Sequence, residues 1–156
     1  MYAQLNTKTV FSFMDATVKL TDYITAAKTL GYQTLGISDV DNLHAAHQFI
    51  TQAKAAGIQP VIGYETTLLL DGLAINFTFI AKTNAGLQNL YSISSKKNFG
   101  YNNFSDIHSH LGDVALILPA DSAVDSILTH LPQNDVFVGL AQPMAQGFLR
   151  PTIPFL

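Results

Sequence analysis

Acidic side chains follow two apolar runs in the first half of the chain. Asp39 lies in GISDVDNL, and Glu65 ends IGYE. Carboxylates are ligands for divalent cations, so two of them at the ends of neighbouring strands could contribute to a metal site. Two carboxylates alone hold Mg²⁺ only weakly, because this ion usually needs substrate phosphates to complete its octahedron. The chain contains no Cys, which excludes thiolate ligands and a thiolate nucleophile.

Two histidines after Asp39 are further candidate ligands. His44 and His47 are one helical turn apart after Asp39, a spacing that binds a metal when another ligand joins them. His44 follows Asp39 closely enough to reach the strand ends, whereas His47 is expected to face solvent. If the chain binds a metal, the expected ligands are therefore Asp39, Glu65 and His44.

Other polar residues have plainer explanations. His108 and His110 are two residues apart, so on a helix they point to opposite sides and are expected to be solvated. Ser12 has no acid–base partner nearby in the sequence, so it is expected to serve in a turn or cap and not as a nucleophile.

The elements that must position these residues alternate between strand and helix, which predicts an α/β fold. Asp71-Gly72 is the strongest hairpin signal, because both residues tolerate the positive φ of a tight turn. The predicted strands cover residues 2–6, 33–38, 60–70, 73–81, 114–118, 136–140 and 153–156. The predicted helices cover residues 21–30, 42–56, 84–97, 105–111 and 121–131.

Composition narrows the classes of function. The chain has 156 residues, of which 48% are hydrophobic, enough for one domain with a single core. Its net charge of −3 offers no overall attraction to phosphate backbones, which argues against independent binding of nucleic acid. The sequence has neither a signal peptide nor an apolar run of membrane-spanning length, so a cytoplasmic protein without membrane contact is expected.

Three segments resemble successive motifs of the polymerase and histidinol phosphatase (PHP) domain that opens the alpha subunit of bacterial DNA polymerase III. The segments are LNTKTVFSFMDA, GISDVDNL and IGYE, and a fourth, NFTFIAKT, resembles the strand that follows the hairpin in that family. In the first three segments, the positions that match the family are Phe11, Ser12, Asp15, Asp39, Asn42, Leu43 and Glu65. Family histidines fall on Asn6, Lys8, Val40 and Asn76.

The resemblance implies a fold and a context. PHP domains are similar to a distorted seven-stranded β/α barrel that is longer than this chain. We therefore expect residues 1–156 to form a single PHP-like domain, a truncated barrel with a mostly parallel sheet and one hairpin. The same comparison predicts an N-terminal fragment of a much longer polymerase chain.

The resemblance also implies a degenerate site at Asn6, Lys8, Asp39, Val40, Glu65 and Asn76. Asn is a weak ligand, Val is none, and the charge of Lys repels a cation, so no metal is expected. One hypothesis is that Lys8 occupies the vacated metal position and neutralises Asp39 and Glu65. The alternative is that Lys8 points to solvent from an edge strand.

Two classes of function follow from the resemblance. In the first, the segment is a non-catalytic structural and interaction domain of the alpha subunit, a DNA-directed DNA polymerase of DNA replication. The parent nucleotidyltransferase would use Mg²⁺ and carboxylates farther along the chain, whereas this fragment would hold no cofactor. Its partners would be the rest of the alpha subunit and could include other replisome subunits. DNA would be contacted by the parent and not by this segment. In the second class, the domain is a metal-dependent phosphoesterase, either a 3′–5′ exonuclease or a small-molecule phosphatase.

A loop rich in aromatic side chains follows the fourth of these segments, NFTFIAKT. Its aromatic residues surround Lys96 and Lys97 and are Tyr91, Phe99, Tyr101 and Phe104. Such a mixture could stack on bases. Alternatively, the loop packs its own aromatic rings or docks on the body of the polymerase.

Overall fold

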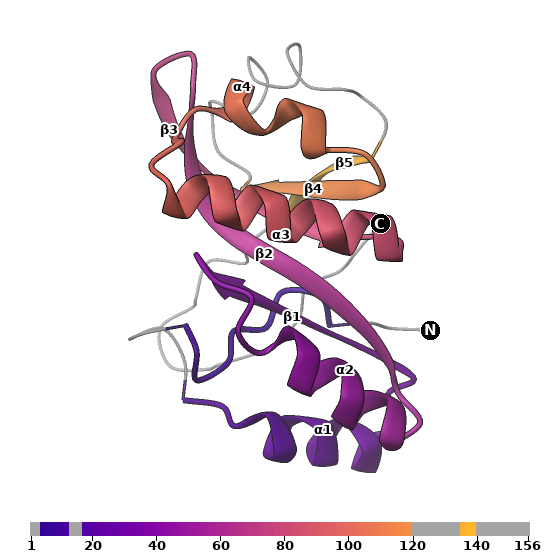
Figure 1. The fold of residues 1–156 in the computed structure, drawn as a ribbon. Coiled ribbons are helices and arrows are strands. Elements are labelled where there is room, and N and C mark those ends of the chain that lie inside the picture. The colour runs from indigo at the N-terminus through magenta and orange to yellow at the C-terminus, as the bar shows by residue number, and fades with distance from the viewer. Residues whose placement is uncertain (1–3, 13–16, 120–134, 140–156) are drawn as a thin grey trace.

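The computed structural model describes residues 4–12, 17–119 and 135–139, shown in colour in Figure 1. The helices are α1 (Leu20–Thr29), α2 (Ala46–Ala55), α3 (Asn84–Asn98) and α4 (Phe104–Ile107), followed by the short 3₁₀ helix η1 (His108–His110). The strands are β1 (Thr34–Val40), β2 (Gln59–Leu70), β3 (Leu73–Ala81), β4 (Val114–Pro119) and β5 (Val136–Gly139). The helix predicted at 121–131 and the strand predicted at 153–156 lie outside the described residues.

Two predicted elements differ from the structure. The strand predicted at 2–6 is reduced, within the described residues, to a single parallel bridge between Gln4 and Leu35. The helix predicted from Asn42 begins only at Ala46. The reason is that the Asn42 side chain accepts a hydrogen bond from the His44 amide at 3.1 Å, which holds these residues in a turn.

The described strands form one five-stranded sheet in the order β1-β2-β3-β4-β5. The pairs β1/β2 and β4/β5 are parallel, whereas β2/β3 and β3/β4 are antiparallel. The sheet is therefore mixed, and the prediction of a mostly parallel sheet is wrong. Closure into a barrel would need strands outside the described ranges, so that part of the expectation stays a prediction.

The segment between β3 and β4 explains the antiparallel pairing. The chain leaves β3 along α3 and comes back through α4 and η1, so it returns to the end of the sheet that it left (Figure 1). Val114, the first residue of β4, pairs with Ala81, the last residue of β3. The Lys82 amide also donates to the Asp113 carbonyl at 3.0 Å. A single helix between the strands would instead have favoured a parallel crossover.

The predicted hairpin is confirmed. Leu70 pairs with Leu73 across a two-residue turn. Asp71 has a φ of +50° and Gly72 a φ of +81°, the two positive values that a type I′ turn requires. The turn sets the register of β2 and β3, and with it the position of every side chain that the two strands place beside each other.

Aromatic side chains fill much of the core between sheet and helices. Phe77 on β3 stacks on Phe104 of α4, with ring centroids 5.0 Å apart, and on Phe79 at 5.8 Å. Phe49 of α2 and Tyr64 of β2 are fully buried. This packing fixes β2, the central strand of the site described below. No helix in the described part of the chain is both long and apolar enough to cross a membrane.

The N-terminal segment lies along the outer edge of β1. The amides of Gly36 and Ser38 donate to the carbonyls of Gln4 and Thr7 at 2.7 and 2.8 Å. A Cβ at Gly36 would lie 2.8 Å from the Leu5 Cα, so only glycine permits this close approach. The contact carries residues 7–12 across the end of β1 toward Asp39.

Candidate functional site

Asp39 is a buried carboxylate held by hydroxyl and amide donors from the N-terminal segment. One carboxylate oxygen accepts from the Thr9 amide at 2.7 Å and from the Ser12 hydroxyl at 2.6 Å. The other accepts from the Thr9 hydroxyl at 2.8 Å. Asp39 is 2% exposed, and Thr9 and Ser12 are fully buried. Three hydrogen bonds therefore replace the solvation that this charge loses on burial.

Ser12 connects two elements as well as binding the carboxylate. Its hydroxyl accepts from the Val40 amide at 3.1 Å while donating to Asp39. Its own amide donates to the Thr9 carbonyl at 2.9 Å, which closes a tight turn. Ser12 thus satisfies the last amide of β1, in keeping with the expected turn or capping role.

Glu65 accepts from one cationic donor and one neutral donor. The Lys8 ammonium lies 3.1 Å from Oε1 of Glu65, and the Asn76 amide nitrogen donates to the same oxygen at 2.8 Å. The Glu65 side chain is 6% exposed and that of Lys8 31% exposed. The hairpin register brings Asn76 into reach, because Glu65 and Asn76 occupy diagonal positions of antiparallel neighbours on one face.

The other predicted positions contribute less. Asn6 is exposed, and Val40 lies beside Glu65 in the parallel register, where it offers no ligand atom. His44 is exposed, with its ring centroid 6.4 Å from that of Phe11. Asp15, a position that matches the family, lies outside the described residues.

The structure thus assigns the predicted site residues to two groups. Lys8, Glu65 and Asn76 come together across the N-terminal segment, β2 and β3, whereas Asp39 is held separately by Thr9 and Ser12. Sequence reasoning missed Thr9. A signal was available, since Thr9 directly follows Lys8 in the first motif and a buried carboxylate needs hydroxyl donors.

These residues do not fit a divalent cation. The Lys8 ammonium and the Asn76 amide both present hydrogens to Glu65, so they meet a cation with the wrong sign of charge or dipole. Among the residues that the structure describes, no three His, Asp or Glu side chains are grouped so that they could hold a metal ion. The donor set instead suits an ion pair with an auxiliary hydrogen bond.

Tyr23 ties α1 to the edge that carries this site. Its hydroxyl lies 2.8 Å from the Thr7 hydroxyl and 3.0 Å from the Gly36 carbonyl. Burial of the ring raises the pKa of Tyr23 to about 12. Burial also raises the pKa of Tyr64, which lies on β2 immediately before Glu65. The neutral Tyr23 side chain therefore connects α1 to the N-terminal segment and to β1, close to the site.

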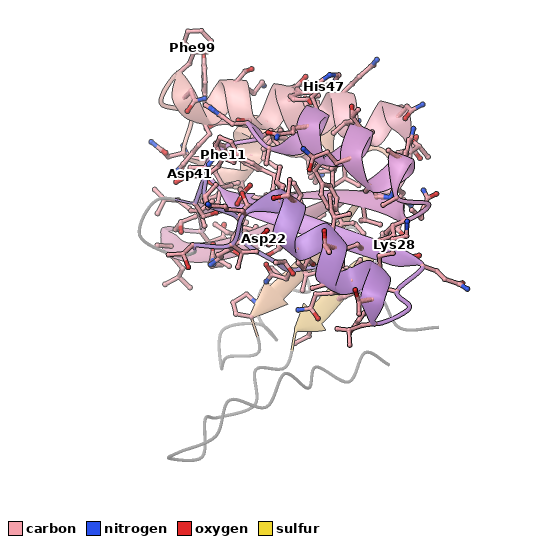
Figure 2. The ribbon with its side chains drawn as sticks, turned by 90° about the horizontal axis from the view of Figure 1, so that it is seen from below. Phe11, Asp22, Lys28, Asp41, His47 and Phe99 are labelled. Carbon is pink, nitrogen blue, oxygen red and sulfur yellow. The ribbon has the colours of Figure 1, made fainter. Side chains whose placement is uncertain are left out.

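The aromatic loop after α3 is ordered by polar contacts but leaves two rings in solvent. Lys97 donates to the Thr67 carbonyl and to the Asn102 side chain, each within 2.8 Å. Phe99 is 84% exposed and Tyr101 52% exposed, and Figure 2 shows Phe99 projecting from the end of α3. Phe104 alone of the predicted cluster is buried. The loop therefore packs only part of its own aromatic side chains, and docking on the body of the polymerase stays a prediction.

Comparison with known proteins identifies similar chains and folds. The family model of the PHP domain matches residues 4–140. The chain is 37% identical over 142 residues to "DNA polymerase III subunit alpha" of Streptococcus pyogenes serotype M3, covering 91% of this chain and 13% of the relative. It is 40% identical over 96 residues to the protein of the same name from Staphylococcus epidermidis, covering 61% of this chain and 9% of the relative.

A solved structure shares the fold. An amidohydrolase from Chromobacterium violaceum, with bound sulfate and no metal, superposes with a TM-score of 0.54 at 12% sequence identity. The match covers 82% of this chain and 72% of that structure. By contrast, the chain spans about 13% of the length of the Streptococcus relative.

Proposed function

The chain belongs to the PHP domain family, and we propose that it is the N-terminal PHP segment of a DNA polymerase III alpha subunit. In this proposal it acts as a structural and interaction domain and carries out no catalysis itself. The parent protein would be the DNA-directed DNA polymerase of replication, a cytoplasmic nucleotidyltransferase. Its Mg²⁺ and catalytic carboxylates would belong to parts of the polypeptide other than this segment.

The observation that carries the structural role is the contact between Lys8 and Glu65. An ammonium 3.1 Å from the carboxylate provides the positive charge that a metal would otherwise supply, and it does so without an open coordination position. The Asn76 side chain donates a hydrogen bond to the same oxygen of Glu65. The arrangement therefore holds three segments together and offers no Lewis acid to a substrate.

The Asp39 group supports the same role. Its carboxylate is enclosed by Thr9 and Ser12, both fully buried, so the charge is used to join the N-terminal segment to β1. A catalytic carboxylate would have to reach a substrate or an activated water. The burial of Asp39 and its three donors favour a structural use.

The proposed partners are the rest of the alpha subunit and, beyond it, other subunits of the replisome. Exposed apolar side chains offer a contact surface at the end of α3 and the tip of the hairpin, where Phe99 is 84% and Leu73 52% exposed. Large exposed apolar side chains commonly mark places where another protein packs. DNA would be contacted by the parent polymerase and not by this segment.

The alternative of a metal-dependent phosphoesterase is not favoured. That chemistry requires metal ions that polarise a phosphate and activate a water molecule. At the family's histidine positions this chain has Asn6, Lys8, Val40 and Asn76, and the last of these already donates to Glu65. No contact in the described residues supports a second role of this kind.

Metal content measured by mass spectrometry tests the proposal. The purified chain would be incubated with Mn²⁺, Zn²⁺ or Mg²⁺ and desalted, and the variant Glu65→Gln would be treated in parallel. We expect substoichiometric metal in both proteins, with no difference between them. Hydrolysis of a phosphodiester and a phosphomonoester would be measured on the same samples and should not exceed the background.

The contrary result is equally clear. One or more tightly bound ions per chain, lost on Glu65→Gln together with metal-dependent hydrolysis, would overturn the structural proposal in favour of the phosphoesterase. The polymerase context is tested separately, by detecting this sequence in source cells with an antibody. We expect a polypeptide many times longer than 156 residues; a native protein of about that size would contradict the context.

A further inference from the structure

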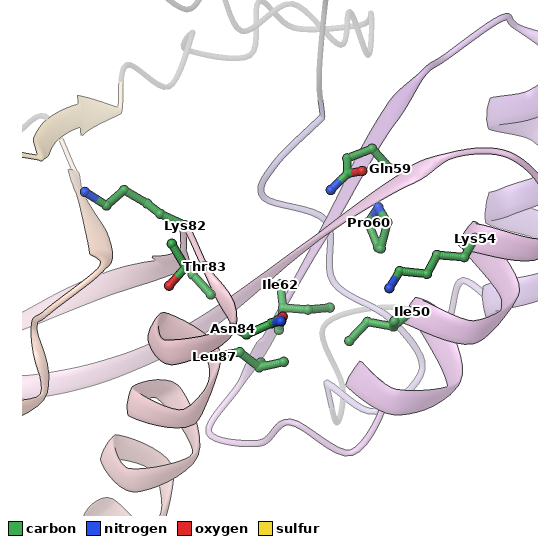
Figure 3. A pocket seen from close by; sticks show the side chains of 10 residues that line it. Ile50, Lys54, Gln59, Pro60, Ile62, Lys82, Thr83, Asn84 and Leu87 are labelled. Carbon is green, nitrogen blue, oxygen red and sulfur yellow. The ribbon is translucent and has the colours of Figure 1, made fainter.

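A pocket lies between α2 and α3, beside the first residues of β2. Its volume is about 150 Å³, and side chains from α2, β2 and the junction of β3 with α3 surround it (Figure 3). The lining residues are Ile50, Lys54, Gln59, Pro60, Ile62, Ala81, Lys82, Thr83, Asn84 and Leu87. Neither Asp39 nor Glu65 lines it, so it is separate from the degenerate site.

The charge of the pocket is positive. Among the residues that the structure describes, two lysines line it and no carboxylate does. Lys82 is engaged at one side, where its ammonium lies 2.6 Å from Asp135. Lys54 forms no ion pair or hydrogen bond through its side chain with any residue that the structure describes, and Figure 3 shows its ammonium extending from α2 toward the strands. A cation directed into a concave site without a counter-charge favours an anionic occupant.

Neutral polar groups supplement this cation. The amides of Gln59 on β2 and Asn84 on α3 line the pocket and can donate hydrogen bonds. Together with Lys54 they come from three different elements, so their donors approach from different directions. Such an arrangement suits a tetrahedral anion, whereas a planar carboxylate is matched best by the fork of an arginine.

We propose that this pocket binds a small phosphate-bearing anion, with Lys54 as its counter-ion. The apolar side chains of Ile50, Ile62 and Leu87 line the same space and would contact a short carbon body attached to the phosphate. A volume of about 150 Å³ is below that of pockets for drug-sized ligands, so the pocket suits a small anion. Inorganic phosphate and a three-carbon phosphate ester share the required chemistry.

Titration of the full 156-residue chain with inorganic phosphate tests the site. Amide shifts would be followed by NMR at constant ionic strength, with sodium chloride as the balancing salt. We expect saturable shifts at Gln59, Asn84 and Leu87, with small shifts around Glu65. The variant Lys54→Gln should weaken binding by about tenfold, the usual loss when one charge-assisted contact is removed.

A matched variant separates a specific site from general electrostatics. Lys28→Gln removes the same charge from the last turn of α1, outside the pocket (Figure 2). It should leave the phosphate affinity within about twofold of the unmodified chain, because screening weakens distant surface charges. Thermal melts of both variants, compared with that of the unmodified chain, would show that each remains folded.

The comparison of ligands then identifies the source of the phosphate group. Tighter binding of glycerol 3-phosphate than of inorganic phosphate would show that the apolar wall contributes, and equal binding would assign the site to the free ion. Acetate should bind more weakly than either. Equal losses in Lys54→Gln and Lys28→Gln, or no saturation below about 10 mM phosphate, would overturn the proposal.

Discussion

The ammonium of Lys8 lies 3.1 Å from the Glu65 carboxylate, and both side chains belong to positions where the family motif places metal ligands. The ion pair gives the nearly buried Glu65 carboxylate a positively charged neighbour from the N-terminal segment. The contact joins the N-terminal segment to β2 across the edge of the sheet.

Removal of that charge should destabilise the domain. Lys8→Met keeps most of the apolar stem of the side chain and removes its charge. Among the described residues, the side chain of the nearly buried Glu65 then keeps only its hydrogen bond from Asn76. We expect a loss of about 1 to 3 kcal/mol in the free energy of unfolding, less than for a fully buried pair because Lys8 is partly exposed. Urea denaturation would measure this loss. The control is Lys28→Met at an exposed position of α1, which should change the free energy of unfolding by no more than about 0.5 kcal/mol.

The second residue of the pair permits a sharper test. Glu65→Gln in the Lys8→Met background removes the unpaired charge, so the double variant should be more stable than Lys8→Met alone. A double variant whose two losses simply add would mean that Lys8 and Glu65 do not interact energetically. The same urea titrations on the unmodified chain, the two single variants and the double variant complete this double-mutant cycle.

The Ser12 hydroxyl should contribute to stability through Asp39. Ser12→Ala removes a donor to the buried carboxylate and the acceptor of the Val40 amide. We expect a loss of about 1.5 to 3 kcal/mol, the range for hydrogen bonds to charged groups. Ser95→Ala, at an exposed position of α3, is the matched control and should change the free energy of unfolding little. Similar values for the two variants would contradict a structural role for the Asp39 cluster.

Gly36 should be intolerant of a side chain. In Gly36→Ala the added Cβ would meet the backbone of Leu5 at 2.8 Å, so the N-terminal segment would have to leave the edge of β1. We expect faster hydrogen exchange at the Ser38 amide, which donates to Thr7 across this edge, together with lower thermal stability. Gly112→Ala is the control, because the nearest atom to its Cβ would be a side-chain nitrogen at 3.7 Å. Unchanged exchange at Ser38 in Gly36→Ala would show that the contact is dispensable.

The phenol of Tyr23 should make stability decline in alkali. The folded chain raises the pKa of Tyr23 to about 12, whereas an unfolded tyrosine titrates near 10. The stabilisation from the neutral phenol is therefore complete below pH 10 and is lost as the pH rises toward 12. Tyr23→Phe should cost about 1 kcal/mol at pH 8, and this cost should shrink or reverse by pH 11.

Melting temperatures measured from pH 8 to 11 would test this pH dependence. Tyr91→Phe, which removes the hydroxyl of a ring that is 43% exposed on α3, is the matched control for the substitution itself. A constant difference between the unmodified chain and Tyr23→Phe over the whole range would argue against a buried, neutral phenol.

Much of the fold could be predicted from local sequence signals. Gly31 and Gly57, each with positive φ, end the predicted helices, and Asp71-Gly72 forms the predicted hairpin. The direction of β4 could not be predicted in this way. It depends on how α3, α4 and η1 fold back on one another, which is decided by tertiary packing such as Phe104 against Phe77.

The site was predictable to a different degree. The positions of Lys8 and Glu65 followed from the order of the motifs, and their proximity is seen in the structure. The donors around Asp39 could not be read from periodicity, because Thr9 and Ser12 reach it through an irregular segment whose path is set by contact with Gly36. Irregular backbone carries no repeating pattern from which side-chain direction can be inferred.

The order of strands in the sheet has a consequence for synthesis on the ribosome. Because the spatial order β1-β2-β3-β4-β5 is also the order along the chain, each strand finds its predecessor already made when it emerges. The N-terminal segment, which borders β1, is likewise available from the start. For the five described strands, pairing can therefore keep pace with translation at about 5 to 20 residues per second, because each strand pairs with the one made just before it.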